Sequence, residues 1–216
     1  MTISATSQGL KPGACTSSNR PANPYTGMMI FETDTNKLGV WNGSAWVFLI
    51  DADMPPGLEL VKTQTIGTAV SSVTVSDAFS STYDNYKITV NGGVISGGAD
   101  MQMQLGSTTS GYYMGSPYTT FAGSTTGLAT SNGSLFPRVG FGSLNDAVAN
   151  IEIMQPFLSR RTMIRCMWSR DETGGLGGFS SGYLDNTTSY TSFTLTNNFS
   201  ATFTGGTIRV YGYRNS

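Results

Sequence analysis

The side chains that most often carry out catalysis are scarce in this sequence. None of its 216 residues is histidine, and its two cysteines are Cys15 and Cys166. Histidine is the usual general base near neutral pH and the commonest metal ligand. A Ser-His-Asp or Cys-His nucleophile and a histidine-bearing zinc site are therefore excluded, and two cysteines cannot form a zinc site of four thiolates. We expect both cysteines to be unpaired thiols, because they lie in different predicted modules.

Carboxylate pairs remain, since two carboxylates hydrolyse glycosidic bonds without histidine. One candidate pair precedes the glycine-rich TGGLGG, which is typical of a solvated turn, and another flanks an alternating strand. Because carboxylate separations cannot be measured from sequence, we assign no catalytic residue and expect no enzymatic activity. The pairs considered are Asp51 with Asp53, Asp146 with Glu152, and Asp171 with Glu172.

The sequence predicts neither a cofactor site nor a metal site. GGLGGF at 174–179 lacks the Lys-Ser/Thr pair and the following helix of a phosphate-binding loop. Asp34 with Asn36, and Asp51 with Asp53, could bind calcium weakly, but neither matches an EF-hand loop.

Charge and hydropathy exclude two further classes of partner. Charged residues make up 12% of the chain, the net charge is −1, and basic residues do not cluster beyond Arg160-Arg161. Nucleic-acid binding normally needs a basic patch, so we expect no nucleic-acid partner. The apolar run from Ala45 to Ile50 is far shorter than the ~20 residues of a membrane helix. The N-terminal MTISATSQGL lacks the regions of a signal peptide.

Aromatic residues beside small polar ones offer a better candidate for binding. Such composition is typical of adaptable binding surfaces, and aromatic faces stack on sugars. We take the segment 108–135 as an exposed loop and a candidate receptor contact, while capping of the domain ends or a subunit interface remains open as an alternative. Its aromatic residues are Tyr112, Tyr113, Tyr118 and Phe121, with Tyr183 and Tyr190 in similar surroundings.

The elements that would position these residues are strands. Apolar and polar residues alternate with period two in many segments, including 86–90, 101–105, 147–153, 164–168 and 193–195. Clusters such as NGGVISGGAD, SNGSLFPR and ETGGLGG separate them as turns. We predict an all-β chain, with a short N-terminal hairpin or meander module over 1–55 and a jelly-roll-like β-sandwich over 56–216. Pro55-Pro56-Gly57 lies in the linker that divides them.

The N-terminal module is predicted to be a meander of strands at 28–32, 38–41 and 45–49. Asn42-Gly43 is typical of a type I′ hairpin turn. A module this small cannot cover its aromatic residues, and chains below ~40 residues usually need a metal, a disulfide or oligomerisation. Oligomerisation is the remaining route here. The candidate oligomer and attachment residues are Phe31, Trp41, Trp46 and Phe48.

This module resembles a segment of tailed-bacteriophage fibre and appendage proteins. The shared features are an R-P-x-x-P-x-x-G lead-in at 20–27, E-T-D-T at 32–35 and W-N-G-S-A-W-V at 41–47. VSSVTVSDAFSSTYDNYKITV (70–90) and GTIRVYGYRNS (206–216) also resemble the opening and closing strands of a β-sandwich at fibre tips. The middle of the chain, about 100–200, carries no resemblance.

The resemblance implies a structural protein of the virion, with no catalytic residues carried over. We expect a homotrimeric short fibre or knob, tail or head, that joins other phage virion proteins through its N-terminus and contacts a host surface glycan or protein. A capsid decoration or cement protein is the first alternative, because 216 residues is short for a full fibre. A glycan-cleaving tail spike is the second.

Overall fold

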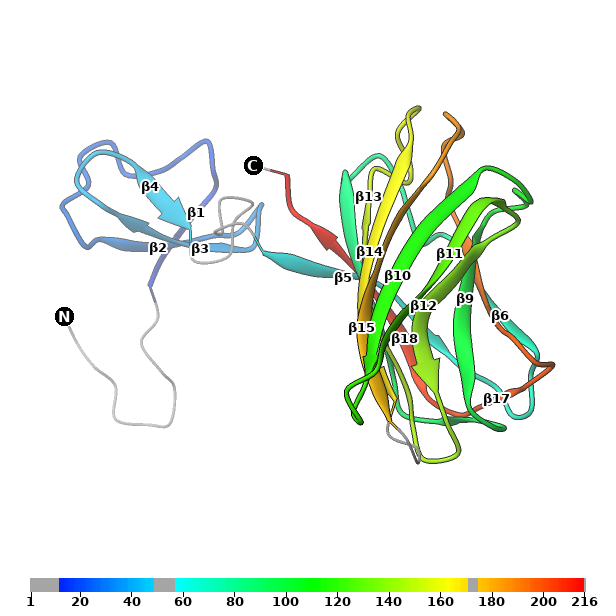
Figure 1. Ribbon diagram of the computed structural model, residues 1–216. Coiled ribbons are helices and arrows are strands. Elements are labelled where there is room, and N and C mark those ends of the chain that lie inside the picture. Colours follow the sequence, from blue (N-terminus) through cyan, green and yellow to red (C-terminus); the bar gives the residue numbers. More distant parts are fainter. Residues whose placement is uncertain (1–11, 49–56, 171–174, 216) are drawn as a thin grey trace. The chain divides into compact units, whose positions relative to one another are not determined.

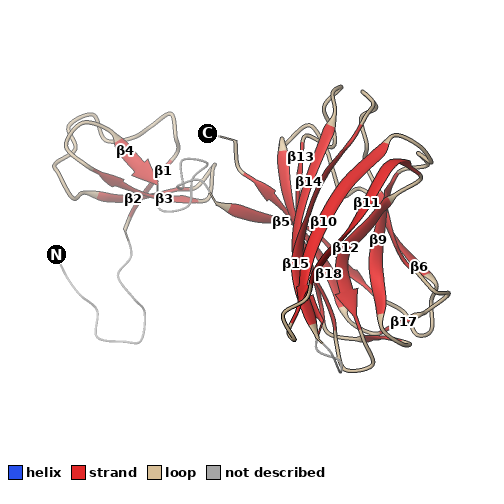
Figure 2. Cartoon of the chain, in the orientation of Figure 1, coloured by secondary structure: helices blue, strands red, loops and turns tan. Residues whose placement is uncertain are grey.

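The computed structural model describes residues 12–48, 57–170 and 175–215, which contain strands and loops (Figure 2). No helix occurs in these ranges, and so none that could cross a membrane. The chain divides into two compact units, Met1–Pro55 and Pro56–Ser216, here called the N-terminal unit and the sandwich unit. The predicted class, an all-β chain with a meander module ahead of a β-sandwich, is confirmed. Both cysteines are free thiols.

The N-terminal unit is one small sheet. Its strand order is β1 (Gly13–Cys15), β2 (Met29–Glu32), β3 (Lys37–Trp41) and β4 (Trp46–Phe48), with β1 parallel to β2 and the other pairs antiparallel. The meander β2–β4 was predicted; β1 was not, because three small residues carry no alternation. Leu49, expected in the last strand, and Asp51, Asp53 and the linker residues 51–56 lie outside the described residues.

The predicted type I′ turn at Asn42-Gly43 is wrong. Trp41 pairs with Trp46, so four residues connect the strands rather than two. Gly43 has a positive φ of 105°, but Asn42 does not. The Asn42 side-chain oxygen instead accepts hydrogen bonds from the backbone N–H groups of Ser44 and Ala45, at 2.9 and 2.8 Å. An asparagine side chain that closes its own turn makes a second positive φ unnecessary.

The sandwich unit has two antiparallel layers (Figure 1). The large layer follows the order β11 (Thr125–Gly133), β10 (Tyr112–Thr120), β15 (Leu176–Leu184), β14 (Thr162–Arg170), β13 (Ala147–Met154), β7 (Asn85–Asn91), β18 (Thr207–Tyr213) and β5 (Leu58–Thr65). The small layer follows β12 (Phe136–Gly142), β9 (Ala99–Leu105), β16 (Phe193–Asn197) and β6 (Ser72–Val75). β8 (Val94–Ile95) and β17 (Phe203–Thr204) form a short additional pair.

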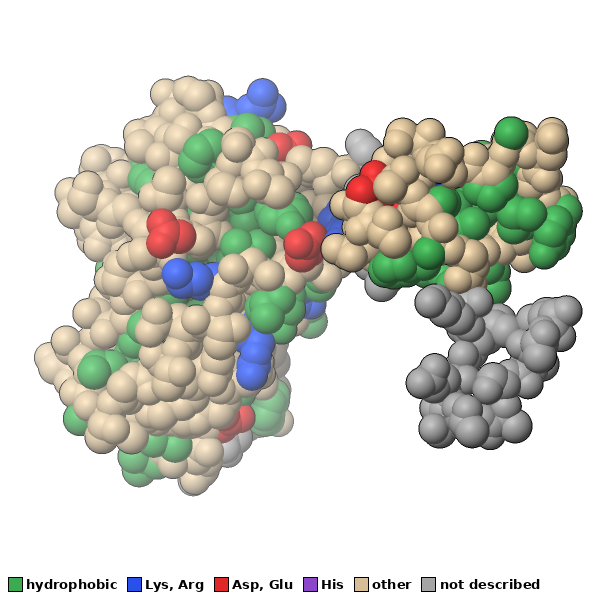
Figure 3. Space-filling model, turned by 180° about the vertical axis from the view of Figure 1, so that it is seen from behind, with side chains coloured by type: hydrophobic (Ala, Val, Ile, Leu, Met, Phe, Trp, Pro, Cys, Tyr) green, Lys and Arg blue, Asp and Glu red, His purple; other side chains and the backbone are tan. Residues whose placement is uncertain are grey.

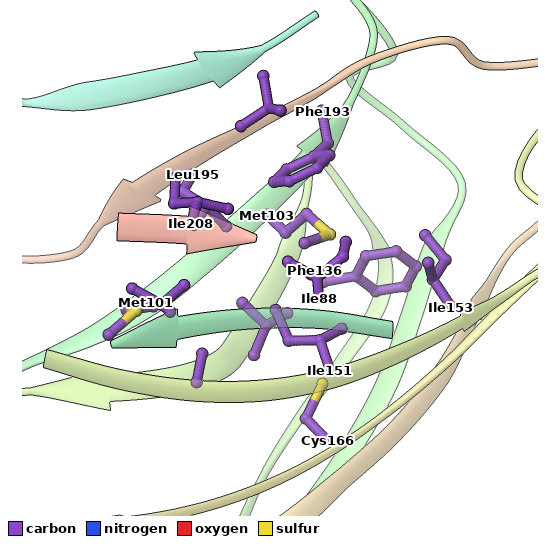
Figure 4. Packing of buried hydrophobic residues seen from close by; sticks show 14 of the residues in the cluster. Ile88, Met101, Met103, Phe136, Ile151, Ile153, Cys166, Phe193, Leu195 and Ile208 are labelled. Atoms are coloured by element: carbon purple, nitrogen blue, oxygen red, sulfur yellow. The ribbon is translucent and has the colours of Figure 1, made fainter. Parts of the chain in front are cut away.

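The layers are joined where β13 changes partner. Its first two residues pair with β12 of the small layer, and the residues from Ala149 onward pair with β7 of the large layer. The core lies between the layers and consists of the alternating residues that point inward from each strand. Figure 4 shows the apolar side chains that meet there, among them Ile88, Met101, Met103, Phe136, Ile151, Ile153, Cys166, Phe193, Leu195 and Ile208. Cys166 is a core side chain, and its burial raises the pKa of the thiol well above its ordinary value.

A buried ion pair lies at one side of this core. Arg138 on β12 donates two hydrogen bonds to the Asp100 carboxylate on β9, at 2.7 and 2.9 Å. The guanidinium lies over the rings of Tyr118 and Trp168, 4.8 Å from each centroid. Asn198 bonds both the carboxylate and the backbone N–H of Asp100. One guanidinium therefore ties together strands of both layers.

Candidate functional site

Strand register sorts the N-terminal unit into two faces, because paired residues share a face of a sheet. Ile30, Gly39 and Phe48 are paired across β2, β3 and β4, as are Glu32 with Lys37 and Trp41 with Trp46. Ile30, Glu32 and Gly39 are buried. We call this side the covered face.

Arg20 lies on the covered face and connects the lead-in to the E-T-D-T segment. It forms an ion pair with Glu32, a carboxylate whose side chain is only 1% exposed, and its guanidinium lies 5.1 Å from the centroid of the Phe48 ring. Thr35 donates a second hydrogen bond to Glu32, at 2.8 Å. The hydrogen bond from Arg20 holds the pKa of Glu32 below its ordinary value, although burial acts in the opposite direction.

The following acidic residue, Asp34, ties down the segment before the lead-in. Its carboxylate accepts hydrogen bonds from the backbone N–H of Ser17 at 2.9 Å and from the Ser17 hydroxyl at 2.6 Å. The Ser17 hydroxyl bond is the main reason that the pKa of Asp34 is lowered. Asp34 therefore links the turn at 32–35 to the segment that precedes the lead-in.

The opposite side of the sheet is open. The residues on this face are all apolar, and those of β2 and the edge strand β4 are more than a third exposed: Met29 38%, Phe31 36% and Val47 49%. Hydrophobic side chains also spread over the visible side of this unit in Figure 3. We call this side the open face; it consists of Ala14, Met29, Phe31, Leu38, Val40 and Val47.

The four predicted interface aromatics therefore do not share one surface. Phe31 lies on the open face. Trp41 and Trp46 pair edge to face on the covered side, with centroids 5.6 Å apart, and Phe48 packs on Gly39, where a β-carbon would lie 2.8 Å from its ring. Sequence reasoning missed Met29, Leu38, Val40 and Val47. Period-two alternation would have identified them, had the register been known.

The segment 108–135 is not the predicted loop. Most of it forms the hairpin of β10 and β11. Tyr112 is fully buried, and its hydroxyl accepts a hydrogen bond from the Leu105 N–H at 2.8 Å; burial raises its pKa to about 12. Tyr118 packs against Trp168 beneath Arg138. The aromatic and small polar residues of this segment therefore form a strand, and the inner face of that strand is part of the core.

The other aromatic candidates are nearer to solvent. Tyr113 is half-buried on the outer face of β10 and stacks on its cross-strand partner Tyr183, with centroids 4.9 Å apart and an interplanar angle of 11°. Phe121, at the tip of the hairpin, is 71% exposed. Tyr190 is buried, and its hydroxyl bonds Thr108 and Asn186 at 2.7 Å each.

The carboxylate pair that falls within the described residues cannot act together. Asp146 precedes β13 and Glu152 lies six residues further along it, at about 3.3 Å per residue. The resulting ~20 Å is about twice the widest spacing in glycosidases. Glu152 is engaged by Arg165 and by the Tyr213 hydroxyl at 3.0 Å. Asp171 and Glu172 lie outside the described residues.

Comparisons with known proteins add little. No protein-family model matches this sequence, and no curated protein matches it. Among solved structures, 82% of this chain aligns with 42% of a chain in the structure of infectious bursal disease virus, Gt strain, at 12% identity and a TM-score of 0.18. The chain thus spans less than half the length of that match. At this TM-score the likeness shows neither a shared fold nor a shared function.

Proposed function

We propose that this chain is a structural protein of a virus particle, and in finer terms a short trimeric bacteriophage fibre or knob. In this proposal the N-terminal unit attaches the protein to the particle, and the sandwich unit faces the host surface. The open face is the observation that carries the proposal. Its six apolar residues lie side by side on a sheet too small to bury them.

An exposed apolar face of this kind needs a partner. Contiguous apolar surface on a protein marks an interaction site, and edge strands such as β4 also leave backbone groups free to pair. Copies of the same chain and a neighbouring virion protein are the two kinds of partner that the proposal requires. The threefold number comes from the resemblance of the 20–47 segment to phage appendage modules.

The proposed role requires no catalysis. A trimer presents three equivalent tips, and many trimers on one particle raise avidity by roughly 10²–10⁴ without strong single sites. Weak contacts to a host glycan or protein are then sufficient for attachment.

The proposal is tested by mass and by incorporation. We expect the purified chain to sediment with threefold mass, and a version lacking residues 1–55 to remain folded, because the sandwich unit has its own core. The shortened protein should be absent from particles. A full-length monomer at micromolar concentration, or normal incorporation of the shortened protein, would contradict the proposal. Labelling spread over the capsid shell would instead favour the decoration role.

A charge placed on the open face should have the same effect as the deletion. Val47→Lys puts an ammonium group at a position of that face that is 49% exposed, where docking would bury the charge without a partner. We expect loss of the trimer in sedimentation, with an unchanged melting temperature of the sandwich unit. Tyr25→Lys is the matched control, because Tyr25 is 68% exposed in the same unit but outside its strands. Equal behaviour of the two variants would exclude the open face as the interface.

A further inference from the structure

A row of small and charged side chains crosses the outer face of the large layer, perpendicular to the strands. Register places the five residues of this row side by side on β10, β15, β14, β13 and β7. In that order they are Gly115, Ser181, Arg165, Glu152 and Lys87. Because their side chains point away from the core, the row lies on the surface, with a floor of small residues at its β10–β15 end.

Larger side chains flank this row on both sides. On one side lie the paired neighbours Phe179 and Met167, which are 55% and 74% exposed. On the other side, Tyr183 lies between Tyr113 and Met163, and the two tyrosine rings stack on each other. Aromatic and thioether groups on both sides of a polar row are unusual for a solvated sheet face, whose outward residues are mostly polar.

The surface is hollowed along the row in three adjoining places. The first hollow, about 350 Å³, lies between the tyrosine pair and Ser181. The second, about 460 Å³, extends from Ser181 past Phe179 to Asn150. The third, about 260 Å³, is bounded by Met154 and Tyr213. The first two share Ser181 and the last two share Glu152 and Arg165, so the hollows form one track, here called the outer groove.

Opposite charges alternate in the row, because the Glu152 carboxylate lies between Arg165 and Lys87. Arg165 forms an ion pair with Glu152, which also accepts a hydrogen bond from the Tyr213 hydroxyl at 3.0 Å. Arg165 remains two-thirds exposed, so it keeps N–H donors available to a ligand. Asn150 and Ser181 add an amide and a hydroxyl to the lining. The groove thus has hydrogen-bonding groups without a strong field of one sign.

We propose that the outer groove binds an extended, uncharged oligosaccharide. Pyranose rings have apolar C–H faces that stack on aromatic rings, and their hydroxyls pair with amide, carboxylate and guanidinium groups. The groove offers aromatic rings along its β10–β15 end and charged and amide groups along β14 and β13. A track that spans several strands suits a chain of sugar units better than a compact ligand. The inference rests on the proposed function, because it names the class of host-surface molecule that the sandwich unit would contact.

Two other occupants fit the groove less well. A nucleic acid needs a run of basic groups along its backbone, and here the Glu152 carboxylate lies between the two basic groups of the row, Arg165 and Lys87. A second copy of this chain would bury the Glu152 carboxylate, and glutamate is depleted at the centres of subunit interfaces. The hollows would also remain unfilled unless the copy offered matching projections.

The test uses the full chain with 13C-labelled methionine methyl groups. The probes are heptamers of glucose, mannose, galactose and N-acetylglucosamine, with dextran sulfate and single-stranded DNA as charged controls. We expect at least one neutral heptamer to shift the methyl signals of Met163 and Met167 saturably. The signals of the core residues Met101 and Met103 should not move. Mixtures that show shifts should contain no new reducing ends, since the groove is proposed to bind without cleaving.

Phe179→Ala should weaken this binding by about tenfold or more, as expected for a central aromatic anchor. Phe199→Ala is the matched control, because Phe199 is 84% exposed in the connection between β16 and β17, away from the groove, and its loss should not alter the shifts. Ser181→Phe, which fills the floor, should abolish them in a folded protein.

Each contrary result has a separate meaning. If no neutral heptamer shifts the Met163 and Met167 signals, the proposal that the groove binds an oligosaccharide is wrong. The proposed virion role is unaffected by that result, because sedimentation and incorporation test it separately. A trimer that dissociates on Phe179→Ala would make the outer face a subunit interface and would also overturn the proposal. If the protein binds sugar but is a monomer and is absent from particles, the proposed oligosaccharide site is supported and the proposed virion role is contradicted.

Discussion

Arg138→Ala is expected to lower the free energy of unfolding of the sandwich unit by about 3–5 kcal/mol, because it leaves the Asp100 carboxylate buried without its cation. Asp100 is 7% exposed, and its two carboxylate oxygens accept hydrogen bonds from Arg138 at 2.7 and 2.9 Å. The truncation also removes the group packed over Tyr118 and Trp168. For a unit of this size we expect the melting temperature to fall by roughly 6–20 °C, measured by thermal circular dichroism.

An exposed ion pair in the same unit provides the control. Arg161 and Asp185 are 2.7 Å apart, but their side chains are 62% and 41% exposed. Arg161→Ala should therefore change the unfolding free energy by no more than about 1 kcal/mol. If the loss of stability comes from the unpaired Asp100 carboxylate, the double variant Arg138→Met/Asp100→Asn should have a free energy of unfolding close to that of the wild type. A loss at Arg138 no larger than that at Arg161 would show that the buried pair is not a stabilising element.

This buried pair illustrates what could not be predicted from sequence. The core strands were predicted, since residues such as Ile151, Ile153 and Ile164 alternate with polar neighbours and alternation depends on neighbouring residues alone. Asp100 and Arg138 are 38 positions apart, and each lies in an ordinary strand pattern. Their contact depends on the order of strands in two layers, which period-two patterns do not encode. The β10–β11 hairpin was misread for a related reason, because Ser, Thr and Gly on its outer face are also typical of loops.

The N-terminal unit shows how strongly faces depend on register. The strands followed from the sequence, but the assumed two-residue turn would have paired Trp41 with Ser44, whereas Trp41 pairs with Trp46. A shift of one residue exchanges the faces of a whole strand. Phe31 and Phe48, both candidate interface residues, lie on opposite faces of the sheet, and the apolar stripe that includes Met29 and Val47 was overlooked. The outer groove could not be predicted from the sequence either, because the residues of its row come from five different strands.

Replacing Arg20 with alanine is expected to unfold the N-terminal unit and to leave the sandwich unit folded. Glu32 would then be a buried carboxylate without its ion-pair partner Arg20, at a cost of about 3–5 kcal/mol. At roughly 0.05–0.15 kcal/mol per residue, a unit of this length is stabilised by only a few kcal/mol. The loss therefore approaches the whole stability of the unit. Since the open face exists only in the folded sheet, the proposed trimer should disappear with it.

The signal for this experiment comes from the tryptophan pair. Two indoles 5.6 Å apart couple in circular dichroism, and this coupling reports the meander separately from the sandwich unit. Arg20→Ala should abolish it. Asp34→Asn is the matched control, because Asp34 is an exposed carboxylate in the turn that follows Glu32. The amide oxygen of asparagine can still accept hydrogen bonds from Ser17. A retained coupling signal in Arg20→Ala would show that the ion pair does not hold the unit together.

Acid should reproduce the effect of removing Arg20. The pKa of Glu32 is lowered by its hydrogen bond from Arg20, so the ionised carboxylate stabilises the folded unit above the ordinary pKa of an unfolded glutamate. That stabilisation is lost as the pH falls through the lower pKa of the folded state. The indole coupling of the wild-type chain should therefore vanish in acid before the sandwich unit melts. In Glu32→Gln the acid dependence should shrink to the part due to Asp34, whose pKa is also lowered. An acid transition of unchanged size in Glu32→Gln would place the sensitivity elsewhere in the unit.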